Sequence, residues 1–336
     1  MSTRRDRVNL DIDVLVVGEI NPDVVVFDSN PTPVFNEVER VVQSIHMTVG
    51  SSSAIFACGA ARLELSVAFF GVVGDDPFGR FMLDAMRVRG IDVSACVVDS
   101  TRSTGATVVL TSGRDRAILT EIGTIGAMDV ATVPESLLSR AGHIHSGCFY
   151  LQEASREKLP GFFEAARARG ISTSFDTNWD PSECWDGGVE EMIAACDVFL
   201  PNAAEARRIA RLDDVREAAR ALARVGAKGR SDGGPIVAVK LGAGGALACR
   251  AEGPLVQVPA MPVDAVDTTG AGDSFNAGFL RAWLGQAGLE ECLRWGAVCG
   301  AASTRRLGGV DAQLTLAEAR ATVACWHGGV TGRPRG

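Results

Sequence analysis

A glycine-rich segment that leads into an apolar helix is the part of the sequence best suited to chemistry. It runs Asp267-Thr268-Thr269-Gly270-Ala271-Gly272-Asp273-Ser274-Phe275-Asn276-Ala277-Gly278-Phe279. Glycine lets a backbone turn tightly and approach a ligand closely. The predicted helix begins directly after this turn, and the free N–H groups at a helix N-terminus attract an anion. Gly270, Ala271 and Gly272 are therefore predicted to cradle a transferring phosphate.

Asp273 lies in the first turn of that predicted helix. A carboxylate beside a bound phosphate is repelled by it, so its presence there needs a reason. Accepting the proton of an attacking hydroxyl group is such a reason. The competing interpretation is that Asp273 only caps the helix. The chain contains no G-x-x-x-x-G-K-[ST] loop, and the residues from Gly18 onward lack the glycine spacing of a dinucleotide-binding fingerprint.

Alternating strands and helices are expected to position this segment. Buried strands are predicted over 14–17 and 67–73, with helices starting after Gly50 and at Asp76-Pro77. From about residue 130 the alternation is regular, which predicts a parallel sheet covered on both faces. The strands predicted in this part are 143–145, 172–175, 198–200, 236–241 and 255–258. His143 and His145 are interpreted as structural residues on opposite faces of one strand.

Two β-rich patches, at about 20–46 and 96–122, interrupt this alternation. We expect them to combine into a small sheet that covers the ligand site, and a homodimer could form through its strands. The strands predicted in the patches are 24–27, 38–42, 97–98, 106–110 and 117–120.

Composition limits the classes of function. The chain has 336 residues, of which 46% are hydrophobic and 22% charged, and its net charge of −8 argues against nucleic acid or an anionic membrane as a partner. No apolar run has the length of a membrane helix, and the N-terminus has no signal-peptide core. Nine cysteines without a C-x-x-C pair favour a reducing, cytoplasmic setting. One α/β domain over 13–327 is expected, between flexible tails at 1–12 and 328–336.

The glycine-rich segment resembles the C-terminal signature of the ribokinase, or phosphofructokinase-B, family of sugar kinases. Other segments resemble the family in the same order along the chain, so that the likeness covers roughly residues 13 to 312. They are residues 50–63, 71–79, 176–179, 201–205 and 240–245. The resemblance implies a three-layer sandwich with a mostly parallel central sheet and a small β-sheet lid. It also implies ATP-dependent phosphorylation of a hydroxyl group on a sugar-like molecule.

The resemblance assigns roles to individual residues. Asp273 would be the general base, and Gly270, Ala271 and Gly272 would form the anion hole. Asn202 and Glu205 would organise Mg²⁺ through its water shell. Three residues would lie beside the nucleotide: Lys240, Gly242 and Gly245. Asp267 and Thr269 match positions that often hold a monovalent cation such as K⁺.

On the acceptor side, the resemblance points to four residues that would bind or line the pocket for hydroxyl groups: Asn21, Asp23, Gly50 and Ser51. The chain departs from the family pattern at Ser51, usually glycine, and at Ile55, usually asparagine. Since Ile55 cannot hydrogen-bond a sugar, the acceptor is expected to have an apolar or deoxygenated edge, or to be held differently from ribose. Lys240 stands where threonine is frequent.

Two other functions stay open from the sequence. A nucleoside kinase is one, because the family includes members that resemble adenosine kinase. A ligand-binding regulator that keeps the fold without turnover is the other, although the intact segment from Gly270 to Asp273 argues against it.

Overall fold

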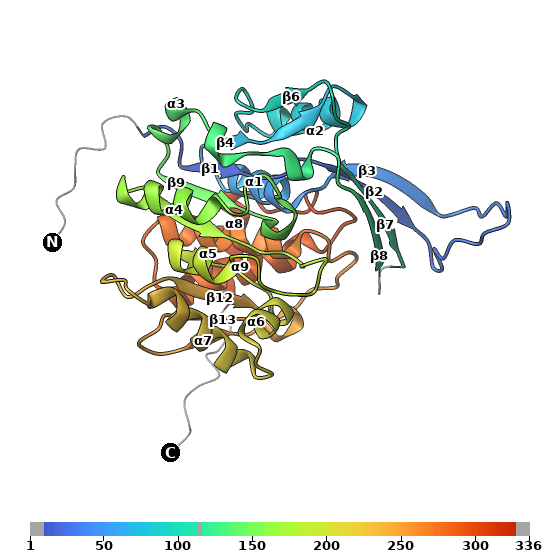
Figure 1. The fold of residues 1–336 in the computed structure, drawn as a ribbon. Coiled ribbons are helices and arrows are strands. Elements are labelled where there is room, and N and C mark those ends of the chain that lie inside the picture. Colours follow the sequence, from blue (N-terminus) through green and yellow to red (C-terminus); the bar gives the residue numbers. More distant parts are fainter. Residues whose placement is uncertain (1–9, 113–115, 327–336) are drawn as a thin grey trace, which may run out of the picture.

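A central sheet of eight strands organises the molecule (Figure 1), which we describe from a computed structural model for residues 10–112 and 116–326. The strand order is β14-β13-β12-β11-β10-β9-β1-β4, in which β13 runs antiparallel to both of its neighbours and the other seven strands run in one direction. The strands are β1 (Val14–Val17), β4 (Val67–Phe70), β9 (His143–Ser146), β10 (Ser172–Phe175), β11 (Val198–Phe199), β12 (Ile236–Lys240), β13 (Ala246–Cys249) and β14 (Val256–Val258).

Helices cover both faces of this sheet. Successive residues of β1 enter different cores: Val14 and Val16 belong to one, and Leu15 and Val17 to the other. The first core is built with α1 (Ser52–Arg62), α2 (Pro77–Val88), α8 (Ala271–Leu284), α9 (Leu289–Ser303) and α10 (Leu316–Cys325). The second is built with α3 (Glu135–Leu138), α4 (Leu159–Ala168), α5 (Val189–Ala195), α6 (Ala203–Ala210) and α7 (Val215–Ala227). The predicted three-layer sandwich is thereby confirmed.

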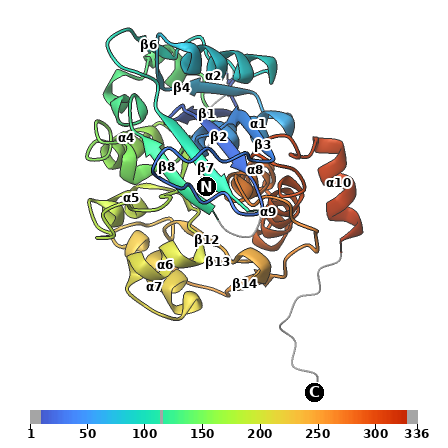
Figure 2. The ribbon, with the colours of Figure 1, turned by 90° about the vertical axis from the view of Figure 1, so that its right-hand side faces the viewer.

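A separate four-stranded sheet, the lid, extends from one side of the body (Figure 1) and lies in front of it when viewed from that side (Figure 2). Its order is β3-β2-β7-β8, in which β2 and β7 are parallel and the other neighbours antiparallel. The strands are β2 (Pro22–Phe27), β3 (Ser44–Val49), β7 (Ala106–Thr111) and β8 (Arg116–Glu121). The small second sheet predicted from the sequence is present.

Three strand predictions need correction. The strand predicted over 38–42 is absent, because that stretch is irregular and the pairing with β2 starts at Ser44. The strand predicted over 67–73 is divided at Gly71, where a Cβ atom would lie 2.5 Å from the carbonyl oxygen of Gly18. The second half, β5 (Val72–Gly74), pairs with β6 (Val97–Asp99) in a two-stranded sheet, so β6 is not part of the lid.

The ends of the domain are only partly described. Ile12 is buried and forms a β-bridge with Ala141. This residue of the predicted N-terminal tail therefore packs against the body. Residues 1–9 and the predicted C-terminal tail, 328–336, lie outside the described residues. In the part of the chain that is described, no helix combines the length and the apolar character needed to cross a membrane.

Candidate active site

The N-terminus of α8 forms the centre of the site. Gly270 is the N-cap residue with φ +68°, and no side chain caps the helix there. The backbone N–H groups of the first turn are therefore not used by a capping side chain, as they are in α1, α2, α6, α7 and α10. A Cβ atom on Gly270 would lie 2.7 Å from Cα of Gly309 and 2.9 Å from Cγ2 of Ile55. Only glycine fits this turn without displacing its neighbours.

Asp273 is the third residue of α8 and is buried. Burial raises the pKa of its carboxyl group well above the usual value, the charge of Asp176 adds to this, and Lys240 opposes it. A carboxylate in such surroundings binds a proton readily, which is the property that a general base needs.

Asp273 lines a large cavity with a volume of about 950 Å³. This cavity is lined by residues of the body and by residues of the lid strands β2, β7 and β8. Five of its acidic side chains are buried: Glu19, Asp23, Asp176, Glu205 and Asp273. Two positively charged side chains also line the cavity, Lys240 from the central sheet and Arg116 from β8 of the lid.

The lid end of the cavity is lined by three of the four predicted acceptor residues, Asn21, Asp23 and Ser51. Asn21 Nδ2 donates a hydrogen bond to Thr107 Oγ1 of β7 over 3.3 Å. Burial raises the pKa of Asp23 to about 7, although Arg116 opposes the shift. Gly50 lies behind Asp23 and not on the cavity wall, since a Cβ atom there would be 2.2 Å from Asp23 Oδ1.

Ser51 joins the acceptor end to the start of α1. Its backbone has φ +65°, and its Oγ accepts a hydrogen bond from the N–H of Ala54 as the helix cap. The same hydroxyl donates to the carbonyl oxygen of Glu19 over 2.7 Å. The carboxylate of Glu19 accepts hydrogen bonds from Ser53 N and Oγ, so it anchors the helix start. Glu19 was not predicted as a site residue, although its place directly after the first strand was a usable signal.

Asn202 and Glu205 form a capping box at the start of α6. Asn202 Oδ1 accepts from the N–H groups of Ala204 and Glu205, and Glu205 Oε2 accepts from the N–H of Asn202 over 2.8 Å. Both residues also line the large cavity. Burial raises the pKa of Glu205 to about 7, and the charge of Asp176 adds to this. The N-x-x-E pattern therefore has a structural role as well as access to the cavity.

Asp267 and Thr269 tie the glycine-rich turn to a neighbouring loop. Asp267 Oδ1 accepts from Thr269 N and Oγ1 over 2.9 and 2.8 Å, and Asp267 Oδ2 accepts from Gly308 N over 2.9 Å. Arg116 of the lid donates to Thr269 Oγ1 over 3.1 Å. Lid, turn and loop are thus joined through Thr269 and Asp267.

A second cavity, of about 560 Å³, adjoins the first and has mostly apolar walls. Gly242 and Gly245 line it beside Lys240, and Gly245 has φ +89° with a Cβ position only 2.1 Å from the carbonyl oxygen of Val258. The two cavities share four residues, which mark their junction: Lys240, Gly242, Thr268 and Gly272.

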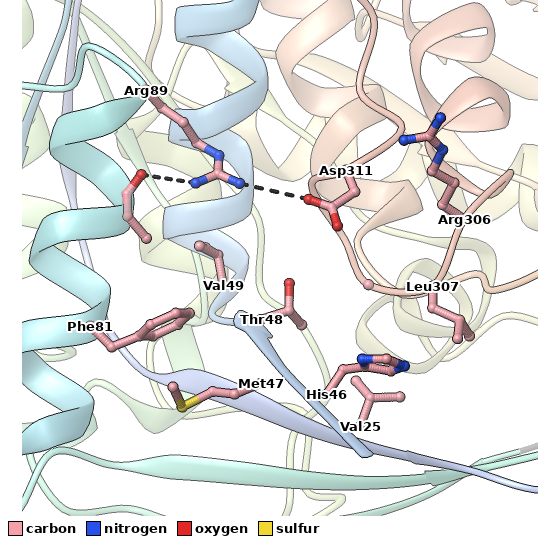
Figure 3. A pocket seen from close by; sticks show the side chains of 12 residues that line it. Val25, His46, Met47, Thr48, Val49, Phe81, Arg89, Arg306, Leu307 and Asp311 are labelled. Carbon is pink, nitrogen blue, oxygen red and sulfur yellow. Dashed lines mark hydrogen bonds and ion pairs between the residues drawn. The ribbon is translucent and has the colours of Figure 1, made fainter. Parts of the chain in front are cut away.

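A third cavity, of about 520 Å³, lies between β3, α2 and residues 306–311 (Figure 3). His46 and Thr48 of β3 face it from one side, while Arg89 and Asp311 form an ion pair of 3.7 Å on the other. It shares no residue with the large cavity, so it is separate from the site.

The two histidines of β9 are structural, but their predicted orientation is wrong. His143 Nε2 and His145 Nδ1 lie 2.7 and 2.8 Å from Ser174 Oγ, so they share one face of the sheet. Residues two apart on a strand point the same way. Burial lowers the pKa of both rings, to about 4 for His143, which keeps them neutral.

A family model for the pfkB family of carbohydrate kinases matches residues 11–315. The chain belongs to the pfkB family of carbohydrate kinases. It is accordingly a phosphotransferase that acts on an alcohol group, within a family of sugar and nucleoside kinases.

Similar proteins of this family differ in their acceptors. The chain is 29% identical over 297 residues to an ATP-dependent ribose-1-phosphate kinase of Halopiger xanaduensis, covering 88% of this chain and 93% of the relative. It is 31% identical over 278 residues to a fructokinase of Klebsiella pneumoniae, covering 78% and 88%. It is 28% identical over 290 residues to a nucleoside kinase of Methanothermobacter thermautotrophicus, covering 85% and 87%.

Solved structures of pfkB and ribokinase proteins have the same fold. A PfkB protein from Polaromonas has a TM-score of 0.75 at 28% identity, with 92% of this chain and 99% of that chain covered. Ribokinase from Arabidopsis thaliana, solved with ribose and ATP, has a TM-score of 0.78 at 20% identity, with 93% and 98% covered. At that identity the second likeness concerns the fold alone.

Proposed function

We propose that the protein transfers the γ-phosphate of ATP to a hydroxyl group of a sugar-like acceptor. The observation that carries this proposal is the place of Asp273, a buried carboxylate in the first turn of an uncapped helix. It lines the cavity of about 950 Å³ under the lid, the lid chamber, which adjoins the apolar cavity of about 560 Å³, the apolar chamber. Family membership supports the same reaction.

Asp273 takes the proton of the acceptor hydroxyl, and the N–H groups at Gly270, Ala271 and Gly272 stabilise the charge of the transferring phosphoryl group. Positioning and charge stabilisation supply most of the rate in phosphoryl transfer, and these groups provide both at the reacting atoms. The apolar cavity beside Gly242 and Gly245 suits the adenine base, and the lid chamber suits the acceptor.

Mg²⁺ fits the nucleotide end of the site only through its water shell. Glu205 presents a buried carboxylate to the cavity, but within the described residues no group of three or more His, Cys, Asp or Glu side chains is arranged to hold a metal ion. Asn202 and Glu205 would hold the hydrated ion, which neutralises phosphate charge when bound. A monovalent cation beside Asp267 and Thr269 would be held by main-chain carbonyl groups, because the side chains bond each other.

The acceptor is bound at the lid by Asn21 and Asp23, with Ser51 beside them. Ile55 supplies an apolar wall of the same cavity while it packs against Gly270 and Gly309. This favours an acceptor with an apolar or deoxygenated edge over ribose.

A nucleoside is the second candidate acceptor. Ile118, Ile122 and Trp179 are apolar residues of the cavity wall, and Trp179 is 44% exposed. A base could stack on that indole ring.

A homodimer through the lid is also proposed. Ile45, Met47, Ile118 and Leu119 of the lid strands are 45–64% exposed, and apolar strands at a sheet edge favour pairing with a second copy. Light scattering of the purified protein measures this directly.

A coupled assay of ADP release over sugars, sugar acids, phosphosugars and nucleosides tests the proposal. One acceptor should stand out, and Asp273→Asn should lower turnover on it by at least about 100-fold while nucleotide affinity changes little. A variant that keeps near-normal turnover would remove Asp273 from the role of base. Ribose as the best acceptor would contradict the specificity drawn from Ile55.

A further inference from the structure

Lys240 lies at the junction of the two cavities. It is the last residue of β12, and its backbone N–H donates to the carbonyl oxygen of Pro201 over 3.0 Å, which fixes the start of the side chain. The side chain is 12% exposed and lines both the lid chamber and the apolar chamber. A nucleotide in one chamber and an acceptor in the other would meet beside it.

Two side chains from other elements hold the ammonium group. Asp176, directly after β10, forms a buried ion pair with Lys240 Nζ through Oδ2. Asn276 Oδ1 accepts from Nζ over 3.4 Å, and Asn276 Nδ2 donates to Asp176 Oδ2 over 2.7 Å. Asn276 follows Asp273 by three residues on α8, so both lie on one face of that helix.

The ammonium group lies against the first turn of α8. A Cβ atom on Gly272 would be 3.5 Å from Nζ and 3.6 Å from Cδ of Lys240. The cation therefore adjoins the N–H groups of the proposed anion hole. Burial disfavours its charge, but Asp176 and Glu205 outweigh burial and raise the pKa, so the amine stays protonated.

We propose that Lys240 is a catalytic residue whose ammonium group contacts the γ-phosphoryl group during transfer, and that Asp176 and Asn276 are positioning residues that aim it. The proposal rests on the proposed kinase function. The acceptor oxygen forms its bond to the γ-phosphorus and gives its proton to Asp273. The bond from that phosphorus to the β–γ bridging oxygen breaks, and its electron pair leaves with ADP. Lys240 keeps its protons and donates hydrogen bonds to the phosphoryl oxygens throughout.

A cation is needed there because the surrounding carboxylates repel a polyphosphate. Asp176, Glu205 and Asp273 all line the chamber next to the anion hole. One ammonium group among them offsets this repulsion at the point where the γ-phosphate would lie. It also lowers the pKa of Asp273 relative to what burial alone would give.

The test compares the affinities of ADP and adenylyl imidodiphosphate, a non-hydrolysable ATP analogue, by calorimetry in the presence of Mg²⁺. Lys240→Met should lower the affinity for the analogue by roughly 10-fold or more, which is the scale of one charge-assisted hydrogen bond. The affinity for ADP should fall by less than about 3-fold. Turnover should fall by at least about 100-fold, and Lys240→Arg should recover part of it. Lys228→Met, at the exposed end of α7, is the matched control and should change neither affinity.

An equal loss of affinity for both nucleotides, or an unchanged affinity for the analogue, would overturn the proposal. If Lys240→Met does not fold because Asp176 is left buried without its partner, the double variant Asp176→Asn, Lys240→Met removes both charges and gives the same comparison. Asp176→Asn alone should lower the affinity for the analogue more than the affinity for ADP, as expected for a positioning residue. If the unaltered protein binds both nucleotides and phosphorylates no acceptor, the proposed function fails, whereas the affinity comparison still decides the contact of Lys240.

Discussion

Replacement of Gly50 by alanine tests the acceptor end of the site without touching a group that would contact the substrate. The added Cβ atom would lie 2.2 Å from Oδ1, 2.5 Å from Cγ and 2.7 Å from the backbone nitrogen of Asp23. The carboxylate can rotate away, but the backbone of β2 is held by pairing with β3 and β7. Asp23 is therefore expected to turn out of its place at the cavity wall.

The size of the effect follows from the contact that is lost. A hydrogen bond between a carboxylate and a substrate hydroxyl contributes about 1.5–3 kcal/mol, so kcat/KM for the acceptor should fall by roughly 10- to 150-fold. The affinity for ATP should change by less than about 2-fold, because neither Gly50 nor Asp23 lines the apolar cavity.

Steady-state kinetics on the best acceptor and calorimetry with ATP measure these effects in Gly50→Ala, Asp23→Ala and the double variant. If Gly50→Ala acts through Asp23, the double variant is no worse than Asp23→Ala. Gly161→Ala, in α4 with open space around the new atom, is the control and should keep full activity. Additive losses, or a loss of ATP affinity with an unchanged acceptor KM, would refute the reasoning.

Three further outcomes are expected. Burial raises the pKa of Asp23 to about 7, so between roughly pH 4 and 7 the native carboxyl keeps a proton that the unfolded chain has lost, and stability falls as pH rises. Asp23→Asn should therefore raise the melting temperature at pH 8 and change it little at pH 4. An equal shift of the melting temperature at the two pH values would contradict a raised pKa for Asp23. Glu205→Gln should raise the Mg²⁺ concentration for half-maximal activity, which an unchanged Mg²⁺ titration or full activity in excess EDTA would disprove. Arg116→Ala removes the bond from the lid to Thr269, so ATP hydrolysis without acceptor should increase relative to sugar phosphorylation; an unchanged ratio in a coupled assay would exclude this role.

The sequence predicted the features that local pattern determines. The alternation of apolar runs with capped helices predicted the layered body, and the glycine-rich segment predicted the helix start that carries Asp273. A tight turn into an apolar helix requires residues that are adjacent in the chain, so its signal is complete in one segment.

Features that depend on distant contacts were missed or wrong. The apolar run from Val67 to Val73 reads as one strand, but the close approach of Gly71 to the Gly18 carbonyl divides it. The strand β13 was not predicted, because Ala246–Cys249 contains no β-branched residue. The contact of Lys240 with Asp176 joins residues 64 positions apart, so no local spacing indicates it. The orientation of His143 and His145 has a different cause, because residues two apart on one strand share a face and the prediction put them on opposite faces.

The parallel pairing of β2 with β7 has a consequence for the order in which the protein folds. Asp23 pairs with Thr107, and the chain between them forms α1, β4 and α2 of the body. Contacts between residues so far apart in the chain form slowly, because the intervening loop must close first. During refolding from denaturant, the lid sheet should therefore assemble after the body has collapsed. Acceptor affinity should then return later than nucleotide affinity, since the apolar chamber is built by the body alone.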